Sequence, residues 1–337
     1  MGIGSLHTPP GPVTMLILIA LLRGRRRILP GLLLLLGGIV ACSPEAPAPT
    51  ATDGGQLGEV LRRGTLMIAT DPAFPPQSEL LANVAPARPT RCATNSYTAN
   101  QLRGLDIDVA VEVSRRLGVE PCFVTPPWAQ IVSGNWNDRW DVHVGSMSIT
   151  GERLQWLYFT QPYLSGGAQM FVYRDSTRFQ SPADLSGRRI GTCAGCAYEN
   201  YLNGTLTMPG QTLKFVVRDA TVIGYDTDTS ALSDLAQGDG ARLDAVLTDP
   251  DTGRKAIADG LAVKPLGEPV YRDYVAISLD KHSSADALPL VIRLSQIIRD
   301  LHSAGFLSAL SLRYYQYDAA TPASQYDLAM LAQYPQR

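Results

Sequence analysis

Three short clusters of polar side chains each follow an apolar segment that predicts a strand. The first contains Asp71 and Phe74 among prolines, the second is the stretch 145–153, which contains serines, a threonine and Arg153, and the third is Asp249. A guanidinium binds a carboxylate through two parallel hydrogen bonds, and hydroxyl and backbone N–H donors complete the shell of that anion. A separate acid can bind an ammonium group. The three clusters together therefore predict a site for a small zwitterion.

Taken one at a time, these residues also have structural explanations. Ser148 or Thr150 could cap the N-terminus of a helix, because hydroxyl side chains accept hydrogen bonds from the first free N–H groups. Arg153 could be a solvated charge on that helix, and Asp249 could end a turn. The residue types alone leave both interpretations open.

The elements expected to position these side chains alternate between strand and helix. Strands are predicted at 65–70, 122–124, 141–145, 171–173, 189–191, 244–249 and 275–277, and helices at 107–118, after 181, at 228–238 and at 288–301. Such alternation predicts an α/β protein with mostly parallel sheets. Ligands of these folds bind outside the carboxyl ends of strands. Asp71, Ser146 and Asp249 fall at such ends.

The N-terminal residues differ from the rest of the chain. A basic cluster within 23–27 precedes an apolar stretch at 28–40, and Cys42 follows small residues. This order predicts a signal for export, and the stretch is too short for a spanning helix. The sequence around Cys42 resembles the lipobox of bacterial lipoproteins, which implies a signal over 1–41, a lipidated Cys42 and a flexible tether over 42–56. An ordinary signal peptide or an uncleaved anchor is the alternative.

Composition bounds the classes of function that need consideration. The chain has 337 residues, of which 45% are hydrophobic, and a formal net charge of −2. These values suit about two globular domains and exclude a strongly basic nucleic-acid binder. Removing residues 1–41 removes four arginines and no acid, so the remaining chain has a net charge of −6. Attraction to anionic lipid would therefore not hold the protein at a membrane.

Longer stretches of the sequence resemble one known family. The segments LRGLDIDVAVEVSRRLGVE, from residue 102, and DVHVGSMSITGERLQWLYFTQPY, from residue 141, resemble the family 3 extracellular solute-binding proteins, the polar-amino-acid receptors of ABC importers. The resemblance implies a periplasmic-binding-protein-like fold of two α/β lobes joined by a two-strand hinge. It implies a discontinuous first lobe, 57–172 plus 275–337, and a second lobe at 177–270.

The same resemblance implies roles for individual residues. Ser146, Ser148 and Arg153 would bind the ligand α-carboxylate, and Asp249 the α-amino group. Asp71 and Phe74 occupy the place of an acid and an aromatic after the first strand, with the aromatic ring over the ligand, and Trp128 would line the pocket. The sequence departs from the family pattern at 193–199, where a threonine that donates to the carboxylate is replaced by Cys196 or Ala197.

Four cysteines follow Cys42, and export permits them to form disulfides. Cys193 and Cys196 form a C-x-x-C motif, which is compatible with a redox pair, half of a metal site or a small disulfide. We favour two disulfides, Cys193–Cys196 in the pocket loop and Cys92–Cys122 across the long segment 77–101, over free or redox-active thiols.

Two other patterns are interpreted as structural. His143 lies in an apolar strand and is expected to be a core histidine with satisfied hydrogen bonds. The motif from Asp226 to Ser230 begins like a calcium loop but lacks its later glycine and glutamate, so we interpret it as a turn and helix cap.

The combined expectation is a non-enzymatic receptor without cofactor or metal. It would be lipid-anchored in the periplasm or at the cell surface, capture an amino acid between two lobes and deliver it to the permease of an ABC transporter. Nucleic acid is not an expected partner. The alternative is an enzyme on the same scaffold, similar to cyclohexadienyl or arogenate dehydratases, with Glu199 as its candidate acid or base.

Overall fold

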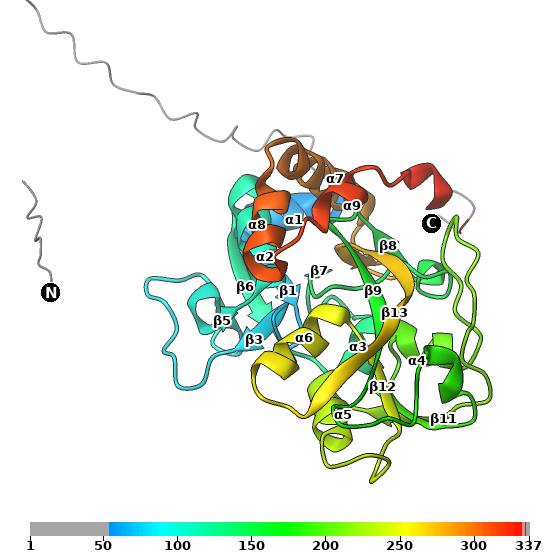
Figure 1. The fold of residues 1–337 in the computed structure, drawn as a ribbon. Coiled ribbons are helices and arrows are strands. Elements are labelled where there is room, and N and C mark those ends of the chain that lie inside the picture. Colours follow the sequence, from blue (N-terminus) through cyan, green and yellow to red (C-terminus); the bar gives the residue numbers. More distant parts are fainter. Residues whose placement is uncertain (1–53, 332–333, 335–337) are drawn as a thin grey trace, which may run out of the picture. The chain divides into compact units, whose positions relative to one another are not determined.

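The computed structural model describes residues 54–331 and 334 (Figure 1). The chain divides into two units, Met1–Glu45 and Ala46–Arg337, and every described residue belongs to the second. The predicted signal, Cys42 and the predicted tether as far as residue 53 lie outside the described residues. Within the described residues, every helix is too short or too polar to cross a membrane.

A six-stranded sheet has the strand order β4-β6-β1-β7-β14-β8. Its strands are β1 Thr65–Ala69, β4 Tyr97–Thr98, β6 Glu120–Val124, β7 Val142–His143, β8 Leu157–Phe159 and β14 Ser278–Asp280. The central strands β6, β1 and β7 run parallel, whereas β4, β14 and β8 join antiparallel. The three parallel strands end at the same edge, so the loops that follow them meet there.

A five-stranded sheet has the order β11-β10-β12-β9-β13. Its strands are β9 Leu164–Tyr173, β10 Arg189–Cys193, β11 Thr221–Tyr225, β12 Ala245–Thr248 and β13 Val263–Val275. Strands β11, β10 and β12 run parallel, and the long strands β9 and β13 pair antiparallel with a register shift between Leu266 and Tyr271. A small third sheet joins β2 Ala73–Phe74, β3 Ser78–Leu80 and β5 Leu102–Arg103.

The helices cover the faces of the two larger sheets. They are α1 Gly55–Arg63, α2 Leu105–Leu117, α3 Trp128–Val132, α4 Ala197–Leu202, α5 Asp228–Leu235, α6 Pro250–Ala258, α7 Leu288–Ser303, α8 Phe306–Tyr315 and α9 Ala320–Ser324, with single 3-10 turns at Ala99–Gln101, Arg153–Gln155, Pro182–Leu185 and Leu328–Leu331. Helix α2 ends at Gly118, whose φ of +81° is the left-handed conformation that stops helices. Helix α1 begins within the predicted tether.

The alternation of side chains along each strand divides the core into layers. In β1, Leu66 and Ile68 pack with α1, α2, α7 and α8, whereas Met67 and Ala69 face a second cluster that contains Trp136. The five-stranded sheet repeats this arrangement. On β9, Phe171 faces α5 and α6, whereas its neighbours Met170 and Val172 face the cluster around α4.

Most predicted elements are confirmed, and one general expectation is wrong. The strands at 65–70, 122–124, 171–173, 189–191 and 244–249 and the helix at 288–301 are present, with bounds that differ by a few residues. The sheets are mixed rather than mostly parallel, because β9, β13, β14 and β8 return antiparallel beside the parallel strands. The limits of the two predicted lobes stay a prediction.

Both favoured disulfides are present in the structure. Cys92–Cys122 joins the long segment before β4 to strand β6, with Cα atoms 5.4 Å apart. Cys193–Cys196 joins the end of β10 to the residue that precedes α4, with Cα atoms 5.5 Å apart. The first bridge lies at the edge of the six-stranded sheet, and the second lies at the end of a strand that reaches the pocket described below.

Gly253 supplies a test of core packing. It lies in α6 directly above the buried ring of Phe171, and an added Cβ would fall 1.9 Å from the Phe171 Cζ atom. We expect Gly253→Ala to lower the free energy of unfolding by about 2 kcal/mol, because overpacking exceeds the gain in helix propensity. Urea denaturation measures the change. Gly54→Ala is the matched control, since nothing lies within 4 Å of that position; equal stability of the two variants would contradict the prediction.

Candidate ligand-binding site

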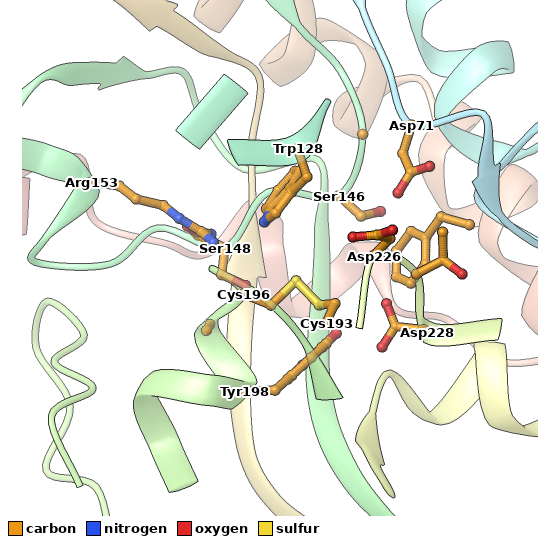
Figure 2. A pocket seen from close by; sticks show the side chains of 14 residues that line it. Asp71, Trp128, Ser146, Ser148, Arg153, Cys193, Cys196, Tyr198, Asp226 and Asp228 are labelled. Carbon is orange, nitrogen blue, oxygen red and sulfur yellow. A yellow bond between two sulfur atoms is a disulfide. The ribbon is translucent and has the colours of Figure 1, made fainter. Parts of the chain in front are cut away.

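The carboxyl ends of five strands surround one pocket. Loops after β1, β6 and β7 come from the six-stranded sheet, and loops after β10 and β11 come from the five-stranded sheet. The pocket holds about 480 Å³ of empty space, including open solvent at its mouth. Its lining residues are Asp71, Phe74, Trp128, Gly145, Ser146, Ser148, Arg153, Cys193, Cys196, Ala197, Tyr198, Asp226, Thr227 and Asp228 (Figure 2). The structure thus brings together every predicted ligand-binding residue except Asp249.

Arg153 is a buried cation that forms no direct ion pair among the described residues, although the negative charges of Glu152 and Asp273 act on it from farther away and partly offset the lowering of its pKa by burial. The residue is 5% exposed, and no carboxylate oxygen of the described residues lies within 4.0 Å of its guanidinium. Nη1 donates to the carbonyl of Ser148 at 3.0 Å, and Nη2 donates to the carbonyl of Gly195 at 3.3 Å. The guanidinium also lies 5.3 Å from the centre of the Trp128 ring. Burial lowers the pKa of Arg153, but a guanidinium stays charged in proteins.

The two serines near Arg153 are held by buried acids. Ser146 has a φ of +50°, a left-handed conformation that non-glycine residues rarely adopt. Its N–H donates to the Tyr163 hydroxyl at 2.8 Å, and its Oγ donates to Asp106 at 3.1 Å. The Ser148 hydroxyl donates to the carboxylate of Asp273. Strained backbone held by such bonds is typical of functional sites.

Three carboxylates lie across the pocket from Arg153 (Figure 2). Asp71 follows β1, Asp226 follows β11, and Asp228 is the first residue of α5. Asp228 is 5% exposed, and the Thr248 hydroxyl donates to it at 2.6 Å. Burial, together with the negative charge of Asp71, raises the pKa of Asp228 to about 7, while the Thr248 bond opposes this shift. Burial also raises the pKa of Asp71.

The Cys193–Cys196 disulfide forms part of the pocket wall between these two ends (Figure 2). The two sulfurs and a carboxylate oxygen of Asp228 lie within 4.8 Å of one another. Because the sulfurs are bonded to each other, they are not available as the thiolates that a metal would require. Where the resemblance predicts a threonine, the pocket wall therefore has the sulfur surface of the disulfide, and the buried Ala197 lines the same pocket.

Asp249 lines a neighbouring cavity instead. That cavity is also lined by Asp251 and Asp273, and it shares Phe74, Ser146 and Tyr198 with the first pocket. One oxygen, Oδ1, of Asp249 already accepts bonds from the Gln77 side chain at 2.9 Å and from two N–H groups at the start of α6. Burial raises the pKa of Asp249 well above its usual range. Its role toward a ligand amino group stays a prediction.

The hydrogen-bond partners of His143 and Glu199 are determined by tertiary packing rather than by the local sequence. His143 is fully buried, as expected, but neither ring nitrogen has a hydrogen-bond partner among the described residues. Burial and the nearby Arg153 lower the pKa of His143 to about 3, so its ring is neutral. Glu199 accepts a bond from the N–H of Gly195 at 2.6 Å and is not among the residues that line the pocket.

The acidic residues after β11 are not among the predicted site residues. The sequence predicts a turn and helix cap at Asp226 to Ser230, and Thr227 does cap α5 by accepting a bond from the Ser230 N–H at 3.1 Å. The same turn also lines the pocket. The signal is the strand Thr221–Tyr225, in which exposed and half-buried residues are mixed and none is fully buried. Without a buried face this segment is not predicted as a strand, so the acids at its carboxyl end are not recognised from the sequence.

The buried acids predict how stability depends on pH. The pKa of Asp106 and the pKa of Asp228 are both raised mainly by burial, from 3.8 to about 7. Between those values the folded chain binds protons that the unfolded chain has released, so these two carboxyl groups make stability fall as pH rises. The lowered pKa of His143 acts in the opposite direction below about pH 6.5, but it is one group against two. We expect the free energy of unfolding without ligand to decrease from pH 4.5 to pH 7.5 by an amount on the order of a few kcal/mol. Denaturation at a series of pH values tests this expectation, and a rise over that range in Asp228→Asn and wild type alike would contradict it.

The two mixed sheets form a periplasmic-binding-protein-like fold, and the buried guanidinium of Arg153 lies in the pocket at their strand ends. The chain belongs to the bacterial extracellular solute-binding proteins, family 3, whose pattern matches residues 88–317. This match confirms the resemblance in the sequence. The family is one of extracellular solute-binding proteins, and curated relatives of this chain are named as binding proteins rather than enzymes.

Individual relatives bind different amino acids. The L-cystine-binding protein TcyJ of Escherichia coli is 27% identical over 270 residues, which cover 79% of this chain and 88% of the relative. The histidine-binding periplasmic protein of Salmonella typhimurium is 26% identical, covering 53% and 64%. Holo ArgBP from T. maritima has the same fold, with a TM-score of 0.59 at 23% identity over 77% of this chain and 99% of that one.

An ancestral amino acid-binding protein described as a precursor of cyclohexadienyl dehydratase also has this fold. Its TM-score is 0.62 at 21% identity, over 77% of this chain and 99% of that chain. At this identity the likeness concerns the fold alone. It therefore does not decide between binding and catalysis.

Proposed function

We propose that this chain is the extracytoplasmic receptor of an ABC importer, which captures an amino acid between its two sheets and delivers it to a permease. Arg153 binds the α-carboxylate with help from Ser146 and Ser148, while Asp249 accepts the α-ammonium group from the neighbouring cavity. Phe74 and Trp128 enclose the ligand. Relatives of this chain are named as cystine-binding, histidine-binding and arginine-binding proteins, which supports an amino acid as the solute.

The buried guanidinium of Arg153 is the observation that carries the proposal. Burying a charge costs free energy unless an opposite charge compensates it. The two carbonyl groups that accept hydrogen bonds from the Arg153 guanidinium orient it but carry no negative charge. The indole N–H of Trp128 is buried nearby, and it lacks a hydrogen-bond partner among the described residues. A ligand carboxylate would satisfy both groups at once. A ligand without an anionic group would leave the guanidinium with no direct counter-ion, because Glu152 and Asp273 act on it only from beyond 4.0 Å.

Closure of the two sheets on the ligand is part of the proposal. Hydrogen bonds between loops of the two sheets support it: Gln77 donates to Asp249 at 2.9 Å, Arg153 to Gly195 at 3.3 Å, and Asn200 to Glu152 at 2.7 Å. A ligand favours the closed state only by binding it more tightly than the open state. Groups from both sheets that contact one ligand provide that preference.

A thermal-shift screen of amino acids, amines and small carboxylates tests the proposed function. A true ligand at a hundred times its dissociation constant stabilises the folded state by about 2.7 kcal/mol. We expect at least one α-amino acid to raise the melting temperature, and its decarboxylated amine to have no effect. Stabilisation by the amine and not by the amino acid would overturn the role of the guanidinium.

We infer that the mature protein is anchored to a membrane through a lipid on Cys42. The expected result of feeding labelled palmitate to bacteria that express the full chain is a labelled protein in the membrane fraction. Cys42→Ser is expected to abolish the label. Ser43→Ala is the matched control, because it changes the next residue without removing the thiol. Label retained in the Cys42 variant would overturn the inference.

The enzymatic alternative has no comparable support. Glu199, the candidate acid or base, binds a backbone N–H and lies outside the pocket-lining set. The carboxylates that do line the pocket face a guanidinium, which is the arrangement of a binding site for a zwitterion. We therefore propose binding without turnover.

A further inference from the structure

Asp273 is a buried acid on β13 with one carboxylate oxygen in use and one without a partner. The residue is 3% exposed, and its Oδ2 accepts a hydrogen bond from the Ser148 hydroxyl. Its Oδ1 has no hydrogen-bond partner among the residues that the structure describes. That oxygen faces Gly166, where an added Cβ would lie 2.7 Å away, and both residues line the cavity beside the pocket. Because buried polar atoms in proteins are normally hydrogen-bonded, Oδ1 indicates a site for a donor in this cavity.

Ser148 places this acid next to the proposed carboxylate site. Arg153 donates to the Ser148 carbonyl at 3.0 Å, and Figure 2 shows the guanidinium beside Ser148. Burial lowers the pKa of Arg153, and the charge of Asp273 is among those that oppose this shift, although no oxygen of Asp273 lies within 4.0 Å of the guanidinium. A cation and an acid at this separation suit the two charged groups of one α-amino acid, which are bonded to the same carbon.

The hydroxyl of Ser148 faces a ligand as an acceptor. A hydroxyl group carries a single proton, and Ser148 donates this proton to the Asp273 carboxylate. Toward a ligand its oxygen can therefore only accept a hydrogen bond, and its backbone N–H is the group that can help to bind the α-carboxylate. The Ser148 hydroxyl and Asp273 together form a surface of acceptors, which suits an ammonium group.

Asp249 alone offers too few acceptors for an α-ammonium group, which has three N–H donors. Its Oδ1 already accepts bonds from Gln77 and from two N–H groups of α6, so Oδ2 is the oxygen left for a ligand. Asp273 lines the same cavity from a different element, the long strand β13 where it pairs with Gly166 of β9. Its free oxygen can form a second charge-assisted hydrogen bond, and the Ser148 hydroxyl can accept the third N–H.

We propose that Asp273 binds the α-ammonium group of the solute together with Asp249, and that this second acid makes a free α-ammonium group a strict requirement. The proposal rests on the proposed function, because it assumes that Arg153 binds the α-carboxylate. A solute without the α-amino group leaves Asp273 buried near a carboxylate with no cation between them. An uncompensated charge of this kind weakens binding.

Calorimetry with amino acids and their deaminated analogues tests the role of Asp273. The probes are L-arginine, L-histidine, L-glutamine and the best amino acid of the thermal-shift screen, each paired with the carboxylic acid that lacks only the α-amino group. We expect Asp273→Asn to weaken binding of the amino acid roughly tenfold or more. Binding of the deaminated acid should change less than about threefold, because the asparagine oxygen can still accept the Ser148 bond.

Asp219→Asn is the matched control. Asp219 is exposed, lies outside both cavities and has a φ of +53°, a conformation that asparagine tolerates. The substitution makes the same change in net charge, so we expect both affinities to equal those of the wild type. This control separates a local contact from general attraction.

Gly166→Ala is a second variant, which keeps the acid and places a methyl group against its free oxygen. We expect it to weaken binding of the amino acid relative to the deaminated acid. Should Asp273→Asn fail to fold, Gly166→Ala decides the question.

Ser148→Ala separates a direct contact of Asp273 from an effect that passes through Ser148. If Asp273 contacts the ammonium group, Asp273→Asn still reduces the ratio of the two affinities when Ser148 is already alanine. If Asp273 only orients the Ser148 hydroxyl, the second substitution has no further effect. That result would overturn the proposal.

The outcomes separate this proposal from the proposed function. An unchanged ratio of the two affinities in Asp273→Asn and in Gly166→Ala, with Arg153→Ala still abolishing binding, would overturn the role of Asp273 and leave the receptor intact. Failure of every amino acid to bind the wild type would instead overturn the proposed function.

Discussion

Arg153→Ala is expected to abolish binding of the cognate amino acid while the protein stays folded. Loss of a guanidinium that meets a carboxylate in a buried site costs about 2–5 kcal/mol, which corresponds to binding that is weaker by roughly thirtyfold to a few thousandfold. Stability should change little, because removing an uncompensated buried charge offsets the loss of two bonds to carbonyl groups. Calorimetry measures the affinity, and circular dichroism during heating measures the fold.

Arg139→Ala is the matched control for this variant. The Arg139 guanidinium also lies over a tryptophan, 4.7 Å from the ring centre of Trp140, and donates to the carbonyl of Trp136 at 2.8 Å, but it is exposed outside the pocket. We expect its affinity to equal that of the wild type. Arg153→Lys keeps the positive charge but loses the planar guanidinium that binds a carboxylate through two hydrogen bonds. We expect its affinity to lie between those of the wild type and Arg153→Ala. Unchanged affinity in Arg153→Ala would refute the carboxylate assignment and the function built on it.

Removal of the Cys92–Cys122 bridge is expected to cause the larger of the two disulfide effects on stability. The bridge spans a sequence separation of 30, whereas Cys193–Cys196 spans 3. If a disulfide acts by lowering the entropy of the unfolded chain, the first bridge adds about 3–4 kcal/mol to the free energy of unfolding and the second adds about 2 kcal/mol. Urea denaturation of two double alanine variants, one for each bridge, measures the difference in the free energy of unfolding.

Ligand affinity should show the opposite order. Cys193 and Cys196 line the pocket, whereas Cys92 and Cys122 do not, so we expect only the Cys193–Cys196 variant to bind more weakly. Thr90 and the N–H of Arg91 also bond to Glu120, so part of the long segment stays attached when the first bridge is removed. A smaller stability loss for the longer bridge would show that strain or residual structure outweighs loop entropy.

Most helices and strands could be predicted from the local sequence pattern, because the residues at the end of a strand or the start of a helix are typical of those positions. Asp71 and Ser146 follow the apolar strands that predict their position, and both line the pocket. The mixed direction of the sheets could not be predicted in this way. Strand direction depends on which segments pair, and β9 pairs with β13 about a hundred residues away. The short β7, with two residues, and β11, with no fully buried residue, show the same limit for the prediction of individual strands.

The sequence by itself determined the family and the order of the strands that carry the site, and it predicted that Arg153 lines the pocket, because each depends on a short contiguous motif. The tertiary structure alone decided which charges share a pocket. It placed Asp226 and Asp228 opposite Arg153 and left Asp249 in the neighbouring cavity. Electrostatic interactions depend on distance and burial rather than on sequence separation, so a pocket assembled from the loops of two sheets acquires its charge pattern only when the chain is folded.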